Sequence, residues 1–392
     1  MKRAVVVDAV RTASGRGKSQ GALAGIHPAV LLADVLSRLI ERNGIDPEQV
    51  DDVIAGCVSQ VGDQAINIAR TAWLTAGMPE SVPATTIDRQ CGSSQQAVHF
   101  AAQGIMAGVY DMVVACGVES MSRVPLGLVT RHGDPDEPLA NRYPGGLVGQ
   151  GISAELVTAK WGFDRRVLDE YAMRSHRLAA ATAAAGGFDR EIIPVTLPDG
   201  SLFVRDETIR PNTTVDALAG LPASFYSEEY AARFPDLTWS ITPGNSSPLT
   251  DGASACLILS EEKAQQLGLT PRASLHSFAV VGSDPLFMLT GVIPATQKVL
   301  DRAGMTIEQI DAYEVNEAFA PVPLAWAHDI GADVERLNPR GGAIALGHPL
   351  GSSGTRILGT LITHLEATGG RYGLQTMCER GGMANALIVE RL

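Results

Sequence analysis

A single histidine stands among five glycines in residues 338–356, Asn-Pro-Arg-Gly-Gly-Ala-Ile-Ala-Leu-Gly-His-Pro-Leu-Gly-Ser-Ser-Gly-Thr-Arg. Glycine lets the backbone approach a ligand closely or adopt a positive φ, at an entropic cost that an ordinary surface loop does not require. We therefore interpret His348 as a positioned imidazole that could take a proton from a thiol or polarise a carbonyl near neutral pH. The alternative is that Gly341, Gly342 and Gly347 are turn glycines around a structural histidine.

Two cysteines are placed where a thiol could react. Cys91 stands where strand-like residues give way to the helix-like segment 95–107, and the free N–H groups at a helix start favour a thiolate. Cys378 lies between an apolar run and two glycines, a position that exposes a reactive side chain at a strand end. A free cysteine is more often a small core residue. We assign that role to the other three, which are Cys57, Cys116 and Cys256.

A polar pair, Asn316 and Glu317, follows another apolar run. Asn316 could fix a water molecule or an oxyanion, and Glu317 could orient His348. The pair could equally form a helix cap.

The elements that must position these residues alternate along the chain. With 392 residues, the chain exceeds the size of a single growing core, so we expect two or three domains. Apolar runs rich in β-branched residues alternate with segments of helical periodicity, which favours an α/β sheet. From about residue 120 to residue 247 the chain becomes rich in loops, with one clear helix capped by Asp164 and ended by Gly186.

The last third of the chain repeats the first. Residues 44–51, Gly-Ile-Asp-Pro-Glu-Gln-Val-Asp, are echoed by residues 304–311, Gly-Met-Thr-Ile-Glu-Gln-Ile-Asp. Element order and several identities recur at an offset of about 260 residues, which indicates a duplication, although a chain rich in glycine could match itself this far by chance. Two similar halves packed about a pseudo-twofold axis would bring Cys91, His348 and Cys378 into one cleft.

Composition excludes several classes of protein. Hydrophobic residues make up 45% of the chain and charged residues 19%, as in globular proteins, and a net charge of -12 argues against a nucleic-acid or anionic-membrane partner. Five cysteines without a CxxC spacing fit free thiols better than disulfides or a zinc site. Residues 4–7 are too short an apolar run for a signal peptide and no run approaches bilayer length, so we expect a cytoplasmic protein without a metal. Gly17-Lys18-Ser19 is similar to a phosphate-binding loop, but Thr12 stands where that motif needs glycine.

Several motifs in order resemble those of the thiolases. They are Cys91-Gly92-Ser93-Ser94, Asn316-Glu317-Ala318-Phe319, Gly347-His348-Pro349 and Cys378 with Gly381-Gly382, supported by segments 119–122, 151–155 and 244–247. The resemblance implies a five-layered αβαβα fold, a dimer or a tetramer of dimers, and acyl transfer between coenzyme A thioesters without a bound cofactor. It also implies an N-terminal half of residues 1–119 completed by 248–268, an inserted loop domain of residues 120–247, and a C-terminal half of residues 269–392.

The resemblance also implies a role for each matched residue. Cys91 is the nucleophile that becomes acylated, His348 is the base that activates it, and Cys378 is a second acid and base. His348 and a water held by Asn316 form one oxyanion hole, and backbone N–H groups of Cys91 and Arg380 form the other. The coenzyme A path is lined by Ser247, Gly244, Met288, Ala318 and Phe319.

The chain departs from the family pattern at three places. Arg380 stands where glycine is common, which matters if that position needs a positive φ. The basic residue that many relatives place near the nucleotide phosphates is missing around Leu221. Gly149-Gln150 replaces the His-Met pair of short-chain acetoacetyl-CoA enzymes, which favours a degradative enzyme for bulkier 3-ketoacyl chains. A ketoacyl synthase of the same fold and a silent acyl-CoA or sterol-carrier-like binding protein remain the alternatives.

Overall fold

The computed structural model describes residues 2–392. The strands are β1 (Ala4–Thr12), β2 (Gly15–Arg16), β3 (Asp52–Gly56), β4 (Ala84–Ile87), β5 (Met112–Ser120), β6 (Ile192–Ile193), β7 (Val195–Thr196), β8 (Leu202–Phe203), β9 (Thr250–Ser260), β10 (Ala273–Gly282), β11 (Ala312–Val315), β12 (Tyr372–Glu379) and β13 (Met383–Arg391). The helices are α1 (Pro28–Arg42), α2 (Ile68–Thr75), α3 (Ser93–Met106), α4 (Gln150–Trp161), α5 (Arg165–Ala184), α6 (Val215–Ala219), α7 (Glu228–Arg233), α8 (Glu261–Gln266), α9 (Val292–Ala303), α10 (Pro321–Ile330), α11 (Ala343–Leu346) and α12 (Ser353–Thr368).

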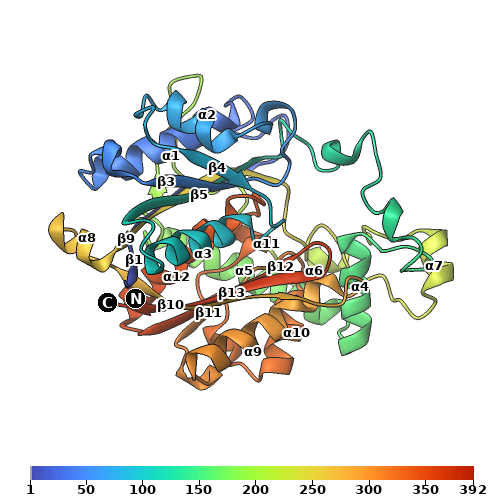
Figure 1. Cartoon of the computed structure of the whole chain (residues 1–392). Helices are drawn as coiled ribbons and strands as arrows, with labels where there is room; N and C mark the ends of the chain where they lie inside the picture. Colours follow the sequence, from blue (N-terminus) through green and yellow to red (C-terminus); the bar gives the residue numbers. More distant parts are fainter. Residues whose placement is uncertain (1) are drawn as a thin grey trace.

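The main elements form five layers (Figure 1). Strands β4-β3-β5-β9-β1 make one sheet layer, with α1 and α2 on its outer face, and β10-β13-β12-β11 make the other, with α9 and α10 outside it. Helices α3 and α12 pack against each other between the sheets. The five-layered αβαβα fold is therefore confirmed. The two sheet layers are joined, because β1 pairs with β10 at Val5↔Ser274 and Val6↔Ala273.

Apolar cores fill the spaces between the layers. Trp73 belongs to the core under α1 and α2, Ile105 and Leu361 belong to the core around α3 and α12, and Trp326 belongs to the core under α9 and α10. All four side chains are fully buried. Because burial of apolar area is the dominant favourable contribution to folding, these cores hold the central helices, and the turns that precede them, in fixed positions.

The duplication is visible as a constant offset between corresponding elements. Strands β3 and β11 start at positions 52 and 312, helices α3 and α12 at positions 93 and 353, and strands β5 and β12 at positions 112 and 372, so the interval is identical in all three pairs. The same interval relates the short 3-10 helices Pro47–Gln49 and Ile307–Gln309 that lie within the echoed segments. The starts of α3 and α12 are therefore equivalent places in two similar halves.

The helix-like segment 95–107 is α3, and the helix expected between Asp164 and Gly186 is α5, each within two residues of its expected ends. Asp164 caps α5 as predicted, since its carboxylate accepts a hydrogen bond from the N–H of Val167 at 2.9 Å. The side chain of Val167, in the first turn of α5, is 37% exposed. Strand β1 runs past the apolar run of residues 4–7 to Thr12, because β9 pairs with it from Ala4 to Arg11 and β6 pairs with it at Arg11 and Thr12.

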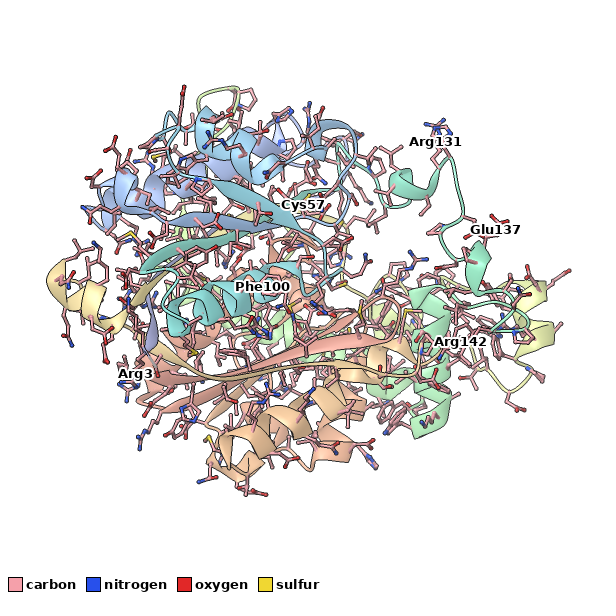
Figure 2. The ribbon with its side chains drawn as sticks, in the orientation of Figure 1. Arg3, Cys57, Phe100, Arg131, Glu137 and Arg142 are labelled. Atoms are coloured by element: carbon pink, nitrogen blue, oxygen red, sulfur yellow. The ribbon has the colours of Figure 1, made fainter. Side chains whose placement is uncertain are left out.

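The segment between β5 and α4 projects from the body of the molecule. Figure 2 shows Arg131 and Glu137 on this projection. A surface ion pair of 2.6 Å between Arg380 and Asp136 connects it to the loop after β12. Among residues 2–392, no helix combines the length and the apolar character needed to cross a bilayer.

Candidate active site

The turn that carries Cys91 is held by its own backbone and by one serine. Gln90 has a positive φ of 48°, and the hydroxyl of Ser93 donates to the Gln90 carbonyl at 2.6 Å while accepting from the N–H of Arg89 at 2.9 Å. A Cβ on Gly92 would lie 2.0 Å from Oε1 of Glu379 and 2.7 Å from Nδ2 of Asn385, so a larger residue would have to displace these two buried side chains. The turn therefore presents Cys91 at the start of α3 in one conformation.

The start of α12 packs directly against the start of α3. The N–H of Thr355 donates to the hydroxyl of Ser94 at 3.1 Å. A Cβ on Gly354 would lie 2.1 Å from the backbone nitrogen of Gln95, so this approach requires glycine. Leu350, two residues after His348, packs on the small apolar cluster that contains Cys91. The structure thus brings the Cys91 turn and the His348 loop together.

Hydrogen bonds on both ring nitrogens fix the imidazole of His348. Nδ1 lies 2.6 Å from the hydroxyl of Ser353, which donates its own hydrogen to the carbonyl of Pro349 at 2.9 Å. Ser353 therefore accepts the Nδ1 proton, and the lone pair stays on Nε2, which lies 3.3 Å from the amide nitrogen of Asn316. Burial, assisted by the charge of Arg356, lowers the pKa of His348 to about 3. The ring is neutral at physiological pH and can accept a proton.

Asn316 and Glu317 have different tasks. The Oδ1 atom of Asn316 is buried without a hydrogen-bond partner among the described residues, so it is free to accept from a water molecule beside His348. The interpretation that Glu317 orients His348 is wrong. Its carboxylate accepts hydrogen bonds from Tyr171 at 2.9 Å and Ser175 at 2.7 Å, both on α5, and so ties the inserted segment to the C-terminal half.

Both candidate thiols are buried. Cys91 is 3% exposed and Cys378 is fully buried at the end of β12, so the predicted exposure of Cys378 is wrong. Burial raises the pKa of Cys91 to about 12, outweighing the hydrogen bond from Gln150, and raises the pKa of Cys378 well above its usual value, with a further contribution from Cys91. A thiolate stabilised at the helix start is therefore not the resting state. Were Cys91 to act as a nucleophile, a base would have to take its proton.

Two further residues at the site, Gln150 and Glu119, have partners that their sequence motifs do not indicate. The amide of Gln150, at the start of α4, donates to Sγ of Cys91 at 3.9 Å. The carboxylate of Glu119 accepts from the N–H groups of Val58 and Ser59, each at 3.0 Å, and from that of Gly351 at 2.9 Å. Glu119 thereby fixes the approach to α12. The segment containing Glu119 was noted as a motif, but its partners lie in distant segments.

The residues expected along the coenzyme A path lie on neighbouring segments. The N–H and the hydroxyl of Ser247 both donate to the carbonyl of Ala318, and the adjacent Ser246 forms a bridge with Phe319. Gly244 is covered by apolar side chains, since a Cβ there would lie 2.6 Å from Leu218 and from Leu221. Met288 is buried in the core of the C-terminal half.

Arg380 meets no backbone obstacle. It is not among the residues with a positive φ, whereas Gly381 and Gly382 have φ values of 85° and 76°. The two glycines therefore make the turn, and the backbone N–H of Arg380 does not depend on the missing glycine.

Known proteins match the chain over its whole length. Residues 4–262 match the family described as "Thiolase, N-terminal domain" and residues 269–391 match "Thiolase, C-terminal domain". A steroid 3-ketoacyl-CoA thiolase of Mycobacterium tuberculosis is 46% identical, covering 100% of this chain and 95% of the relative. A 3-ketoacyl-CoA thiolase of Saccharophagus degradans is 43% identical, covering 99% and 98%. The crystal structure of the Bacillus anthracis acetyl-CoA acetyltransferase matches the fold with a TM-score of 0.89 and 36% sequence identity. The match covers 100% of this chain and 99% of that one.

Proposed function

Since this chain belongs to the thiolase family, we propose that it cleaves 3-ketoacyl-CoA with coenzyme A to acetyl-CoA and a shortened acyl-CoA, or runs the reverse condensation. The observation that supports the site assignment is the line Ser353–His348–Asn316, which leaves a neutral imidazole with its lone pair on Nε2, on a loop whose Leu350 packs on the apolar cluster of Cys91. A protonated thiol needs such a base before it can attack a carbonyl. Cleavage of a carbon–carbon bond needs a second group, which donates a proton to the carbon that leaves.

In the first half-reaction, Sγ of Cys91 attacks the 3-keto carbon while its proton passes to Nε2 of His348. The bond between C2 and C3 breaks, the electron pair stays on C2, and Cys378 donates its proton there. Acetyl-CoA leaves and the shortened chain remains as a thioester on Cys91. The protonated His348 and a water on the free Oδ1 of Asn316 stabilise the enolate oxygen.

In the second half-reaction, the thiol of coenzyme A gives its proton to the Cys378 thiolate and attacks the thioester on Cys91. The backbone N–H groups of Cys91 and Arg380 stabilise the tetrahedral oxyanion. Cys91 then leaves and recovers its proton from His348. Every proton is returned, so no external acid or cofactor is needed.

The substrate size, the location and the assembly of the protein are finer points of the same proposal. We infer a degradative role on bulky chains, because Gln150 replaces the methionine of the short-chain pattern and one relative is named for steroid substrates. Acetoacetyl-CoA and a panel of linear, branched and ring-bearing 3-ketoacyl-CoAs test this inference. A cytoplasmic location, assembly as a dimer or tetramer, and the domain division at residues 119, 247 and 268 stay predictions.

Mass spectrometry of the acylated protein tests the mechanism. After incubation with acetoacetyl-CoA, the acetyl group is expected on Cys91 and not on the buried core thiol Cys57. Cys378→Ala is expected to acylate normally but neither to cleave nor to condense. Coenzyme A binding without an acyl group on Cys91 would favour the silent binding protein, and normal turnover by Cys378→Ala would refute its acid–base role.

A further inference from the structure

Gln150, the first residue of helix α4, contacts the thiol of Cys91. Its amide nitrogen lies 3.9 Å from Sγ of Cys91, and its side chain is half-buried. Within residues 2–392, this amide is the one side-chain donor to that sulfur and makes no other hydrogen bond. Because a neutral thiol is a weak acceptor, the contact contributes little while Cys91 carries its proton.

Contacts along α4 hold its first turns in place. The carboxylate of Glu155 accepts hydrogen bonds from the backbone N–H groups of Ser240 and Ile241, each at 2.8 Å. Gly151, the second residue of the helix, packs so closely on Phe225 that a Cβ there would lie 2.4 Å from the ring. The amide at the start of α4 is therefore held beside the sulfur by the surrounding fold, and needs no large rearrangement to donate to it.

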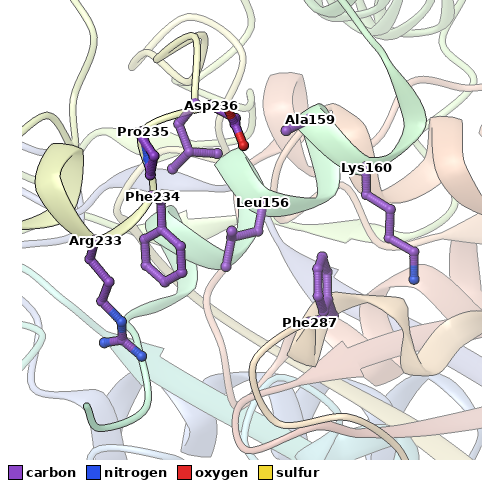
Figure 3. Close-up of a pocket in the computed structure, with 9 residues that line it drawn as sticks. Leu156, Ala159, Lys160, Arg233, Phe234, Pro235, Asp236 and Phe287 are labelled. Atoms are coloured by element: carbon purple, nitrogen blue, oxygen red, sulfur yellow. The ribbon is translucent and has the colours of Figure 1, made fainter.

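The second half of α4 faces other neighbours. It lines a cavity of 380 Å³, where Figure 3 shows Leu156 and Lys160 of this helix together with Phe234 and Phe287. The ammonium of Lys160 lies 4.8 Å from the centroid of the Phe287 ring. Leu156 is six residues beyond Gln150, about 9 Å further along the helix axis. This part of α4 therefore provides a control position on the same helix.

The groups around Cys91 disfavour its anion, with the amide of Gln150 as an exception. Burial, with a further contribution from charges on Glu379 and Glu119, raises the pKa of Cys91 to about 12. The second thiol, Cys378, is buried with a raised pKa and provides no positive charge. The amide acts in the opposite direction, because a hydrogen bond to the charged form favours that form.

We propose that Gln150 is a catalytic residue whose amide N–H stabilises the sulfur anion of Cys91. When the thiol proton passes to Nε2 of the neutral His348, negative charge develops on Sγ and the weak contact becomes a charge-assisted hydrogen bond. In the second half-reaction the bond between the acyl carbon and Sγ breaks, the electron pair goes to Sγ, and the same N–H donates to the leaving thiolate. A bond that is stronger in the transition state than in the resting state accelerates both steps. The inference rests on the proposed function, in which Cys91 is the nucleophile.

Alkylation of Cys91 by iodoacetamide tests the proposal without requiring turnover, since the thiolate is the reacting form. Gln150→Met keeps an unbranched side chain and removes the N–H. It is expected to lower the alkylation rate at pH 8 about tenfold and to shift the rise of that rate with pH upward by about one unit. Mass spectrometry confirms that the adduct is on Cys91. Leu156→Met is the matched control, because it places the same side chain on the same helix, and it should match the unchanged protein.

A second variant covers the case in which Gln150→Met does not fold. Gln150→Glu has the same shape but places a carboxylate beside the sulfur, so it should lower the alkylation rate at pH 8 by at least tenfold. Alkylation at the unchanged rate in the folded variants, or an equal fall in Leu156→Met, overturns the proposal.

Thiolysis rates separate a role in catalysis from one in substrate binding. Gln150→Met should lower kcat about tenfold for acetoacetyl-CoA and for a long-chain 3-ketoacyl-CoA alike. A change in chain preference with unchanged alkylation would assign Gln150 to substrate binding and overturn the proposal. Failure of the proposed function looks different, because the unchanged protein then turns over no 3-ketoacyl-CoA. The alkylation rates of the variants still decide whether Gln150 stabilises the thiolate.

Discussion

Two glutamates occupy equivalent places in the two halves of the molecule but have opposite surroundings. Glu119, near the end of β5, and Glu379, at the end of β12, are related by the same offset as the strands that carry them. Glu119 accepts hydrogen bonds from three backbone N–H groups and from the amide of Gln64. Both oxygens of Glu379 are buried without a partner among the described residues, against Gly92.

The difference shows that equivalent positions in the two halves have different roles, one structural and one beside the candidate site. The carboxylate of Glu119 is an anchor for the start of α12, where the imidazole is held. Its counterpart lies beside the Cys91 turn, and a charge on Glu379 raises the pKa of both thiols. Burial raises the pKa of Glu379 to about 8, so this carboxyl is largely protonated at neutral pH. The two thiols therefore have little negative charge from Glu379 beside them at that pH.

The largest effect is expected from substitution of His348. The interval that separates α3 from α12 makes Asp88 the equivalent residue in the first half. His348→Asn removes the proposed general base and should lower kcat by about 10³-fold, within the range for such catalysts. Asp88→Asn keeps the acceptor for the N–H of Gln90 and should change kcat by no more than about threefold. Steady-state rates of both purified variants measure the contrast. Equal losses would show that the two loops are not functionally distinct.

The next effect is on stability. Glu119→Gln puts an amide N–H against backbone donors and should lower the free energy of unfolding by about 3 kcal/mol. Glu379→Gln meets no such donors and should not lower the free energy of unfolding at pH 7. Urea unfolding followed by circular dichroism provides both values. A stable Glu119→Gln protein would contradict the anchoring role.

A smaller effect is expected from the first serine of each helix. Ser353→Ala removes the acceptor for the Nδ1 proton of His348 and should lower kcat about tenfold with little change in KM. Ser93→Ala loosens the Cys91 turn without touching the imidazole, and should cost about 1 kcal/mol of stability. The pH profile of kcat separates the two, because only Ser353→Ala should shift its acidic limb.

The smallest effect concerns pH. Because the folded-state pKa of Glu379 is raised, its contribution to stability is full below its usual pKa near 4.5 and is lost as pH rises through about 8. The buried charge formed at high pH is therefore destabilising, and Glu379→Gln should gain about 1 kcal/mol of stability on the unchanged protein between pH 7 and pH 9.5. Melting temperatures from pH 6 to 9.5 test this. Parallel curves for the two proteins would contradict the raised pKa.

Much of the fold could be predicted because its signals are local or repeated. The cap at Asp164, the alternation of apolar runs and helices, and the echo of residues 44–51 in 304–311 each occupy a short window. Glu317 was misread because its partners, Tyr171 and Ser175, belong to an inserted segment whose docking no local pattern specifies.

Residue types and their order determined by themselves which chemistry this chain can carry, because two thiols and a glycine-framed imidazole in a fixed sequence of motifs admit few alternatives. Only the tertiary structure decided the protonation states of the thiols and the imidazole. Burial keeps Cys91 a thiol, and Ser353 places the lone pair of His348 on Nε2. Solvation and hydrogen bonding depend on what distant segments place around a group, so the charge state of each proposed catalytic residue is a property of the fold.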